Sequence, residues 1–153
     1  MRTDYNLETM EDTEKMAREL AATVSGGEII TLSGPIGAGK TTFAKAFAAT
    51  LGITATVTSP TFTLMNLYEL PHEIRGIKKL VHIDAYRAES SDELRAAGIE
   101  DFLNEPDAVV LIEWPEHCID MLRRKKIVEI DFLVASESRR CTIKKPPVCD
   151  SEL

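Results

Sequence analysis

The chain has 153 residues, of which 44% are apolar and 28% are charged, and its formal net charge at pH 7 is −7. This length allows one sizeable hydrophobic core, and the composition is that of a soluble globular protein. No run reaches the roughly 18 apolar residues of a membrane span, and the negative charge disfavours nucleic-acid binding by the chain alone. We expect one domain over residues 1–144, a disordered tail over 145–153, and no membrane association.

Two features of the sequence favour a cytoplasmic location. The three cysteines, Cys118, Cys141 and Cys149, are an odd number and lack the C-x-x-C spacing of zinc and redox sites. They indicate a reducing compartment and inert thiols. The first twelve residues hold four acids and a single base, Arg2, which is not the pattern of a signal or transit peptide.

The expected elements alternate between helix and strand. In chain order they are a helix over 9–24, a strand over 28–33, a glycine loop, a helix over 40–51, a loop and strand over 56–68, a surface connection over 70–76, a strand over 79–84, a short helix over 90–98, a strand over 108–113 and a hairpin over 126–144. Thr9 with Asp12, and Ser90 with Glu93, are expected to cap their helices, and the glycines at 26 and 27 to stop the first one.

The glycine loop carries the strongest chemical signal. Residues 34–41 read GPIGAGKT and match G-x-x-x-x-G-K-[ST] at every position, between a predicted strand and a predicted helix. Glycines let successive N–H groups turn inward around a phosphate, and the helix adds its N-terminal amides. Lys40 is then placed for the β- and γ-phosphates, and the Thr41 hydroxyl for Mg²⁺. The nucleotide-binding residues expected here are Gly34, Gly37, Ala38, Gly39, Lys40, Thr41 and Thr42.

This P-loop and the element order predict an α/β fold of P-loop NTPase type, in three layers, with a mostly parallel central sheet and a C-terminal antiparallel hairpin. Two acids, Asp84 and Glu113, end predicted strands, so both should emerge at the sheet edge that holds the phosphates. They are candidates for metal binding and for orienting a nucleophile. His82 shares the strand face of Asp84 and is interpreted as a core or supporting residue.

Bases are concentrated late in the chain. Residues 123–126 are four consecutive bases, and Arg139, Arg140, Lys144 and Lys145 follow. A solvated surface explains them, and so does a docking face for an acidic partner or an RNA. The sequence leaves both readings open.

Four segments together resemble one family. They are GPIGAGKTTF at 34–43, VTSPTFTLMNLYE at 57–69, HIDAYR at 82–87 and LIEWPE at 111–116. In this order they are similar to the TsaE family, the P-loop ATPases of bacterial tRNA threonylcarbamoyladenosine biosynthesis. The resemblance runs from about Thr9 to Val134, and the basic hairpin and the tail lie outside it.

The resemblance implies an activity and partners. Members bind ATP with Mg²⁺, hydrolyse it weakly alone, and support threonylcarbamoyl modification of the tRNA adenosine next to the anticodon. They act on the partner proteins TsaD and TsaB, and the ATP cycle resets that complex. Transfer of the threonylcarbamoyl group belongs to TsaD, so tRNA is an indirect or complex-bound substrate.

The resemblance also implies roles for single residues. Thr41 and Glu113 match the magnesium side of the site, and Asp84 matches the acid required for hydrolysis, as water-positioner or base. Thr61 lies where a switch-like segment would sense the γ-phosphate, and Trp114 would pack near the nucleotide. The expected catalytic residues are Asp84, Lys40 and Thr61. The segment over 9–13 is a candidate for adenine contact.

Three residues depart from the family pattern, namely Pro35, Ile36 and Ala85, and none of them is a residue expected to act in catalysis.

Two other functions stay open: a small-molecule kinase, although no arginine-rich lid is evident, and a nucleotide switch without useful turnover. ATP is expected over GTP because no guanine-specifying N/T-K-x-D motif is present.

Overall fold

A computed structural model describes residues 1–60 and 63–147 of the chain. Its strands are β1 (Arg2–Asn6), β2 (Ile29–Ser33), β3 (Met65–Ile74), β4 (Ile77–Asp84), β5 (Ala108–Glu113), β6 (Ile127–Ala135) and β7 (Ser138–Lys144). Its helices are α1 (Met10–Ala21), α2 (Lys40–Thr50), α3 (Ser91–Ala96), α4 (Ile99–Leu103), the 3₁₀ helix η1 (Pro115–Cys118) and α5 (Ile119–Leu122).

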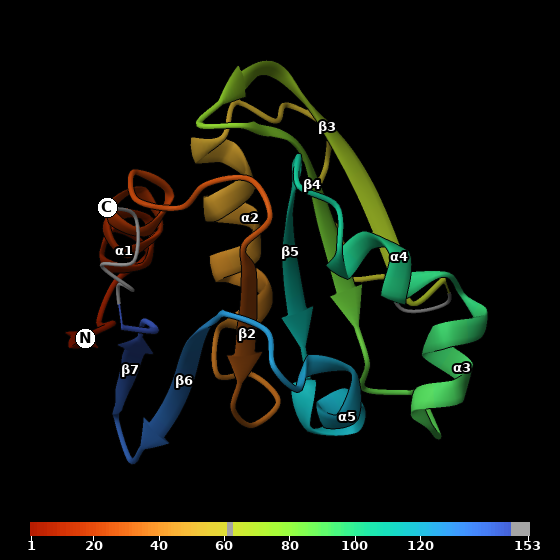
Figure 1. Cartoon of the computed structure of the whole chain (residues 1–153). Coiled ribbons are helices and arrows are strands. Elements are labelled where there is room, and N and C mark those ends of the chain that lie inside the picture. The colour runs from red at the N-terminus through yellow and green to blue at the C-terminus, as the bar shows by residue number, and fades with distance from the viewer. Residues whose placement is uncertain (61–62, 148–153) are drawn as a thin grey trace.

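The described strands form one seven-stranded sheet in the order β1-β7-β6-β2-β5-β4-β3 (Figure 1). The four central strands, β6, β2, β5 and β4, run parallel to one another. The outer strands β1, β7 and β3 pair antiparallel, and β6 with β7 forms the C-terminal hairpin. The predicted fold class is therefore confirmed.

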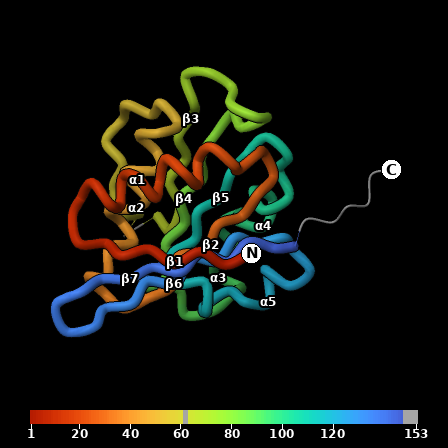
Figure 2. The backbone as a smooth tube through the Cα atoms, turned by 90° about the vertical axis from the view of Figure 1, so that its left-hand side faces the viewer, coloured from red at the N-terminus to blue at the C-terminus, as the bar shows by residue number. Residues whose placement is uncertain are grey.

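Helices cover both faces of the sheet and make three layers. Figure 2 shows α1 and α2 on one side of the strands and α3 and α5 on the other. Side chains alternate along each strand, so that Leu32 of β2 packs with Phe43 and Phe47 of α2, whereas Ile29 belongs to the cluster on the opposite face. β5 is buried along its whole length because it lies between both layers, which explains its unbroken apolar run.

The N-terminus of α1 has the predicted capping box. The Thr9 side chain accepts a hydrogen bond from the amide of Asp12 at 3.3 Å, and the Asp12 carboxylate accepts one from the amide of Thr9 at 2.9 Å. The helix ends at Ala21, earlier than the glycine stop that was predicted. Arg75 explains the end, because its guanidinium donates to the carbonyl oxygens of Ala21 and Val24.

The surface connection predicted over residues 70–76 is too long, because only Arg75 and Gly76 form a turn. β3 continues through this segment to Ile74 and passes Pro71. β3 is an edge strand, where the missing N–H of a proline costs little, and its pairing with β4 shifts register between Glu69 and Ile74.

The capping box predicted at Ser90 is also absent. The Ser90 side chain makes no cap hydrogen bond to α3. The carboxylate of Glu93 instead accepts from the amide of Glu89 at 3.0 Å, one residue earlier than predicted. The helix is short and depends on packing of Leu94, which is fully buried.

Within residues 1–60 and 63–147, no helix combines the length and the apolar character needed to cross a bilayer. The amide of Lys145 donates to the carbonyl of Met1 at 2.9 Å, next to the β1–β7 pair. Residues 148–153 of the predicted tail lie outside the described residues, so the division into a domain and a disordered tail stays a prediction.

Candidate functional site

The P-loop joins β2 to α2 at the carboxyl edge of the parallel strands. Gly37 and Gly39 have φ angles of 78° and 107°, and a Cβ built on either would meet nothing within 4 Å. The loop thus opens on free space at these positions, as a phosphate cradle requires. Gly34 is a glycine for another reason, because a Cβ there would come within 2.6 Å of the carbonyl oxygen of Phe132 in β6.

Lys40 is folded back onto its own loop. Its ammonium donates to the carbonyl of Gly34 and lies 3.5 Å from the centroid of the Trp114 ring. The side chain is buried, and burial lowers the pKa of Lys40 below its usual value despite the opposing effect of Glu113 and two further carboxylates. The buried Lys40 ammonium thus lies next to the open P-loop.

Trp114 holds its position through an uncommon backbone conformation. Its φ of 60° lies in the left-handed region and turns the chain from β5 into η1. Its amide donates to the carbonyl of Leu32 at 3.3 Å, and its ring contacts Tyr86 with centroids 4.8 Å apart. The sequence segments HIDAYR and LIEWPE therefore meet at this ring, next to the P-loop lysine.

Glu113 is buried between two donors. Its Oε1 accepts a hydrogen bond from the Thr41 hydroxyl at 3.2 Å, and its Oε2 lies 3.1 Å from Nε2 of His82. Asp84 is its register partner in β4, so the two acids emerge at the same edge as the P-loop, as predicted. The structure thus brings Thr41, Glu113 and Asp84 into one site.

Asp84 is held by two different groups. Its Oδ2 accepts from the Ser59 hydroxyl at 2.8 Å, and its Oδ1 accepts from the amide of Tyr86 at 3.0 Å. Ser59 begins the SPTF segment, residues 59–62, of which positions 61 and 62, and so the expected catalytic residue Thr61, lie outside the described residues. The sequence interpretation missed Ser59, and its position just before Pro60 in the matching segment was the available signal.

A cavity of about 550 Å³ adjoins the P-loop on the side of α1. Three segments line it: Leu7, Glu8, Thr9, Met10 and Thr13 at the start of α1; Ala38, Gly39 and Thr42 of the P-loop region; and Glu137, Ser138 and Arg139 at the hairpin tip. The segment proposed for adenine contact therefore lies beside the P-loop. We did not predict that the hairpin tip would line this cavity, because its sequence does not show which strand the hairpin pairs with.

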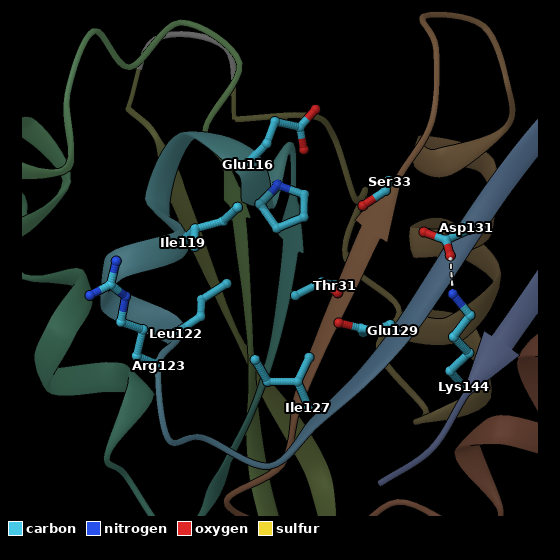
Figure 3. Close-up of a pocket in the computed structure, with 11 residues that line it drawn as sticks. Thr31, Ser33, Glu116, Ile119, Leu122, Arg123, Ile127, Glu129, Asp131 and Lys144 are labelled. Carbon is cyan, nitrogen blue, oxygen red and sulfur yellow. Dashed lines mark hydrogen bonds and ion pairs between the residues drawn. The ribbon is translucent and has the colours of Figure 1, made fainter. Parts of the chain in front are cut away.

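A second hollow, of about 500 Å³, lies on the opposite face of the sheet between α5 and β6. Figure 3 shows Thr31 and Glu129 side by side on neighbouring strands, and Asp131 paired with Lys144. The two charged groups of that pair are 3.3 Å apart. The lining of this hollow holds more acids than bases, which disfavours phosphate. Arg123, from the run of four bases, lines one end of it.

The two cysteines among the described residues, Cys118 and Cys141, take no part in the site. Burial raises the pKa of Cys118 to about 11 and that of Cys141 to about 12, so both thiols are protonated at neutral pH. Both are free. Cys149 lies outside the described residues.

A P-loop between a strand and a helix, at the carboxyl edge of a parallel sheet with acids on neighbouring strands, defines the P-loop NTPase class of folds. The chain belongs to the TsaE family: the family model described as threonylcarbamoyl adenosine biosynthesis protein TsaE matches residues 7–142. The match includes most of the hairpin, which the motifs had left outside the resemblance. The family assignment supports a role in tRNA threonylcarbamoyladenosine biosynthesis and favours it over a small-molecule kinase.

Individual relatives agree with the family model. The tRNA threonylcarbamoyladenosine biosynthesis protein TsaE of Bacillus subtilis is 36% identical over 132 residues, covering 86% of this chain and 78% of the relative. That of Aquifex aeolicus is 44% identical over 112 residues, covering 72% and 74%. The crystal structure of Bacillus subtilis YdiB superposes with a TM-score of 0.68 at 30% identity, covering 95% of this chain and 86% of that one.

Proposed function

We propose that the chain binds ATP with Mg²⁺ and hydrolyses it in support of threonylcarbamoyl modification of tRNA, acting on a TsaD–TsaB complex. The observation that carries the proposal is the meeting of the Thr41 hydroxyl and the Glu113 carboxylate, 3.2 Å apart, at the end of an unbroken P-loop. Membership of the TsaE family supplies the biological context.

The donor set at this point fits magnesium. A hydroxyl and a carboxylate are hard oxygen ligands, and Mg²⁺ is usually held by one or two such groups together with phosphates. Bound Mg²⁺ would supply neutralisation of the negative charge on the phosphate oxygens. Thr41 and Glu113 are the residues proposed to hold it.

Lys40 and the loop amides are proposed to bind the phosphates. Gly37, Ala38 and Gly39 belong to the loop and Thr42 to the first turn of α2, and in this structure the amide of Ala38 donates to the carbonyl of Pro35 at 3.2 Å. The Lys40 ammonium is buried against one carbonyl and one aromatic ring, contacts weaker than a pair of charged phosphates offers. An incoming nucleotide should therefore draw Lys40 out of its contact with Trp114.

Asp84 is proposed to orient the attacking water. Its two oxygens accept hydrogen bonds from Ser59 and from the amide of Tyr86. Release of the Ser59 hydroxyl would leave one oxygen free for a water hydrogen, while the amide keeps the carboxylate in place. The family resemblance adds Thr61 as the sensor of the γ-phosphate.

The cavity beside the loop suits the nucleoside. It is continuous with the P-loop residues Gly39 and Thr42, and the start of α1 forms its opposite wall. Apolar and hydroxyl side chains there, from Leu7, Thr9 and Met10, are suited to hold an adenine and its ribose. We propose ATP as the nucleotide on this basis.

The SPTF segment is proposed as the moving part. Ser59 connects it to Asp84, and Asn66 of β3 donates to the carbonyl of Thr58 at 3.2 Å. Nucleotide state can bias such a segment between two arrangements and so change the affinity for a partner. Transfer chemistry is then left to TsaD, in the cytoplasm, with tRNA held by the complex.

Reconstitution tests the proposal. Purified TsaD and TsaB, tRNA and radiolabelled threonine are combined with the threonylcarbamoyl donor system, with and without this chain and ATP. We expect multiple turnovers only when the chain and hydrolysable ATP are both present, and partner-stimulated ATP turnover in the same mixture. Equal cycling without the chain, or tRNA modification by the chain alone, contradicts the proposal.

A further inference from the structure

His82 is a fully buried polar residue in the apolar interior. It lies in β4, and its side chain projects on the same face as those of Leu80 and Asp84, two residues away on either side. This is the face that α2 covers. A histidine here has lost all contact with water, so its ring nitrogens need protein partners.

One ring nitrogen has such a partner and the other has none. Nε2 lies 3.1 Å from Oε2 of Glu113, whose side chain is 3% exposed. Among residues 1–60 and 63–147, Nδ1 makes no hydrogen bond. A carboxylate can only accept, so Nε2 carries the hydrogen and donates it. The ring is thus directed at Glu113 alone, at the cost of an unpaired Nδ1.

The hydrogen bond from His82 gives the two carboxylate oxygens of Glu113 different partners. His82 occupies Oε2, and Oε1 is left toward the hydroxyl of Thr41. We propose that His82 is a positioning residue that fixes the carboxylate of Glu113 so that Oε1 faces the metal position. The inference rests on the proposed function of Thr41 and Glu113 as the magnesium ligands.

The alternative role is purely structural. His82 could serve only to satisfy a buried carboxylate, and its loss would then lower stability without changing metal dependence. Outer hydrogen-bond partners of metal ligands typically change metal affinity roughly 10- to 100-fold when removed. The two roles therefore differ in a measurable property other than stability.

The test compares His82 variants that differ in whether a side-chain donor can reach Glu113. His82→Gln keeps an N–H donor near the position of Nε2, His82→Asn shortens the side chain so that the donor falls short, and His82→Leu removes the donor. Binding of a non-hydrolysable ATP analogue is measured by calorimetry at increasing Mg²⁺ concentration, with urea unfolding in parallel. Leu80→Ala, a buried change on the same strand face, is the matched control.

We expect His82→Asn and His82→Leu to raise the Mg²⁺ concentration at half-effect by roughly 10- to 100-fold, with analogue binding in the absence of Mg²⁺ unchanged. His82→Gln should stay close to the wild type, and Leu80→Ala should lose stability alone. If His82→Leu fails to fold, the Gln and Asn pair decides. Unchanged Mg²⁺ dependence in His82→Asn, or an equal shift in Leu80→Ala, overturns the inference. Failure of the proposed function looks different, because the wild type itself would then show no Mg²⁺-dependent binding.

Discussion

Asp84 and Glu113 are register partners at the ends of two adjacent parallel strands, yet they contact different parts of the molecule. Glu113 faces α2 and the P-loop through Thr41, whereas Asp84 contacts the SPTF segment through Ser59. Two acids at one sheet edge can therefore act on different groups. This separation underlies our assignment of one acid to the metal and the other to the water.

Removal of the P-loop side chains should weaken Mg-ATP binding and abolish useful turnover. Hydrogen bonds to charged groups contribute about 1.5–3 kcal/mol, so Lys40→Ala should weaken ATP binding by roughly ten- to a hundredfold. Thr41→Ala should weaken the response to Mg²⁺. Calorimetric titration with ATP, with and without Mg²⁺, measures both. Thr50→Ala serves as control, because the Thr50 hydroxyl donates to the carbonyl of Ala46 on the exposed side of α2. Unchanged affinity and turnover in Lys40→Ala and Thr41→Ala would refute the site.

The site was predictable where local sequence determines geometry. The P-loop sequence determines the conformation of its own backbone. Asp84 and Glu113 lie at one edge because the carboxyl ends of parallel strands meet there. The contact between Lys40 and Trp114 was not predictable, because it depends on the left-handed turn at Trp114. The role of Ser59 depends on how a long connection folds back over the sheet, which periodicity does not encode.

The same distinction holds for the fold. The buried strands have apolar, β-branched runs and the two long helices have apolar residues at helical spacing, and both kinds of element were predicted. β1 (Arg2–Asn6) was missed because its sequence carries little apolar pattern, and pairing with β7 stabilises it. α4 and α5 have only five and four residues, too short for a helical pattern to emerge. The predicted strand ended before β3 does, because the sequence does not show that β3 is an edge strand, where Pro71 is tolerated.

The capping box of α1 should make stability depend on pH. The hydrogen bond from the Thr9 amide holds the pKa of Asp12 below its ordinary value of 3.8. A lowered folded-state pKa stabilises the protein above the unfolded value, and this contribution is lost as pH falls through the folded pKa. The unfolding free energy of Asp12→Asn should be below that of the wild type at pH 7, and the gap should close below about pH 3.8. A gap that persists at pH 2 contradicts this account.

Loss of the Thr9 side chain should destabilise the same helix by about 1 kcal/mol. Thr9→Ala removes the acceptor for the Asp12 amide, and urea unfolding at pH 7 measures the change. Thr9→Ser keeps the hydroxyl and is the matched control. Because Thr9 also lines the cavity beside the P-loop, ATP affinity should be followed in both variants. Equal stability of the Ala and Ser variants would show that the cap contributes nothing.

The buried cysteines should resist thiol reagents. A rise in the pKa of Cys118 from 9.0 to about 11 lowers its thiolate fraction at pH 8 about a hundredfold, and Cys141, at about 12, is lower still. In a Cys149→Ser background, labelling of the native protein with a chromogenic disulfide at pH 8 should be slow. Both thiols should react at once in denaturant. Fast native labelling of either cysteine would contradict the burial described.

The two acids should separate binding from hydrolysis. Glu113→Ala should weaken the Mg²⁺ dependence of ATP binding, because the carboxylate beside Thr41 is lost. Asp84→Ala should bind Mg-ATP normally and hydrolyse it about 10²–10⁴-fold more slowly, the usual cost of losing a positioned base or water-orienting group. ATP affinity by calorimetry and partner-stimulated turnover are the two measurements.

Asp131→Asn is the matched control for both acid variants. Asp131 lies at the same sheet edge but on the opposite face, where it pairs with Lys144, so its loss should change neither affinity nor turnover. A further variant tests the contact between Ser59 and Asp84. Ser59→Ala removes the hydroxyl that donates to Asp84 and so frees one of its oxygens, and ATP turnover should stay at least as high as in the wild type. Normal hydrolysis by Asp84→Ala with TsaD and TsaB present would remove Asp84 from the chemistry, and its contact with Ser59 would then be a structural hydrogen bond between β4 and the SPTF segment.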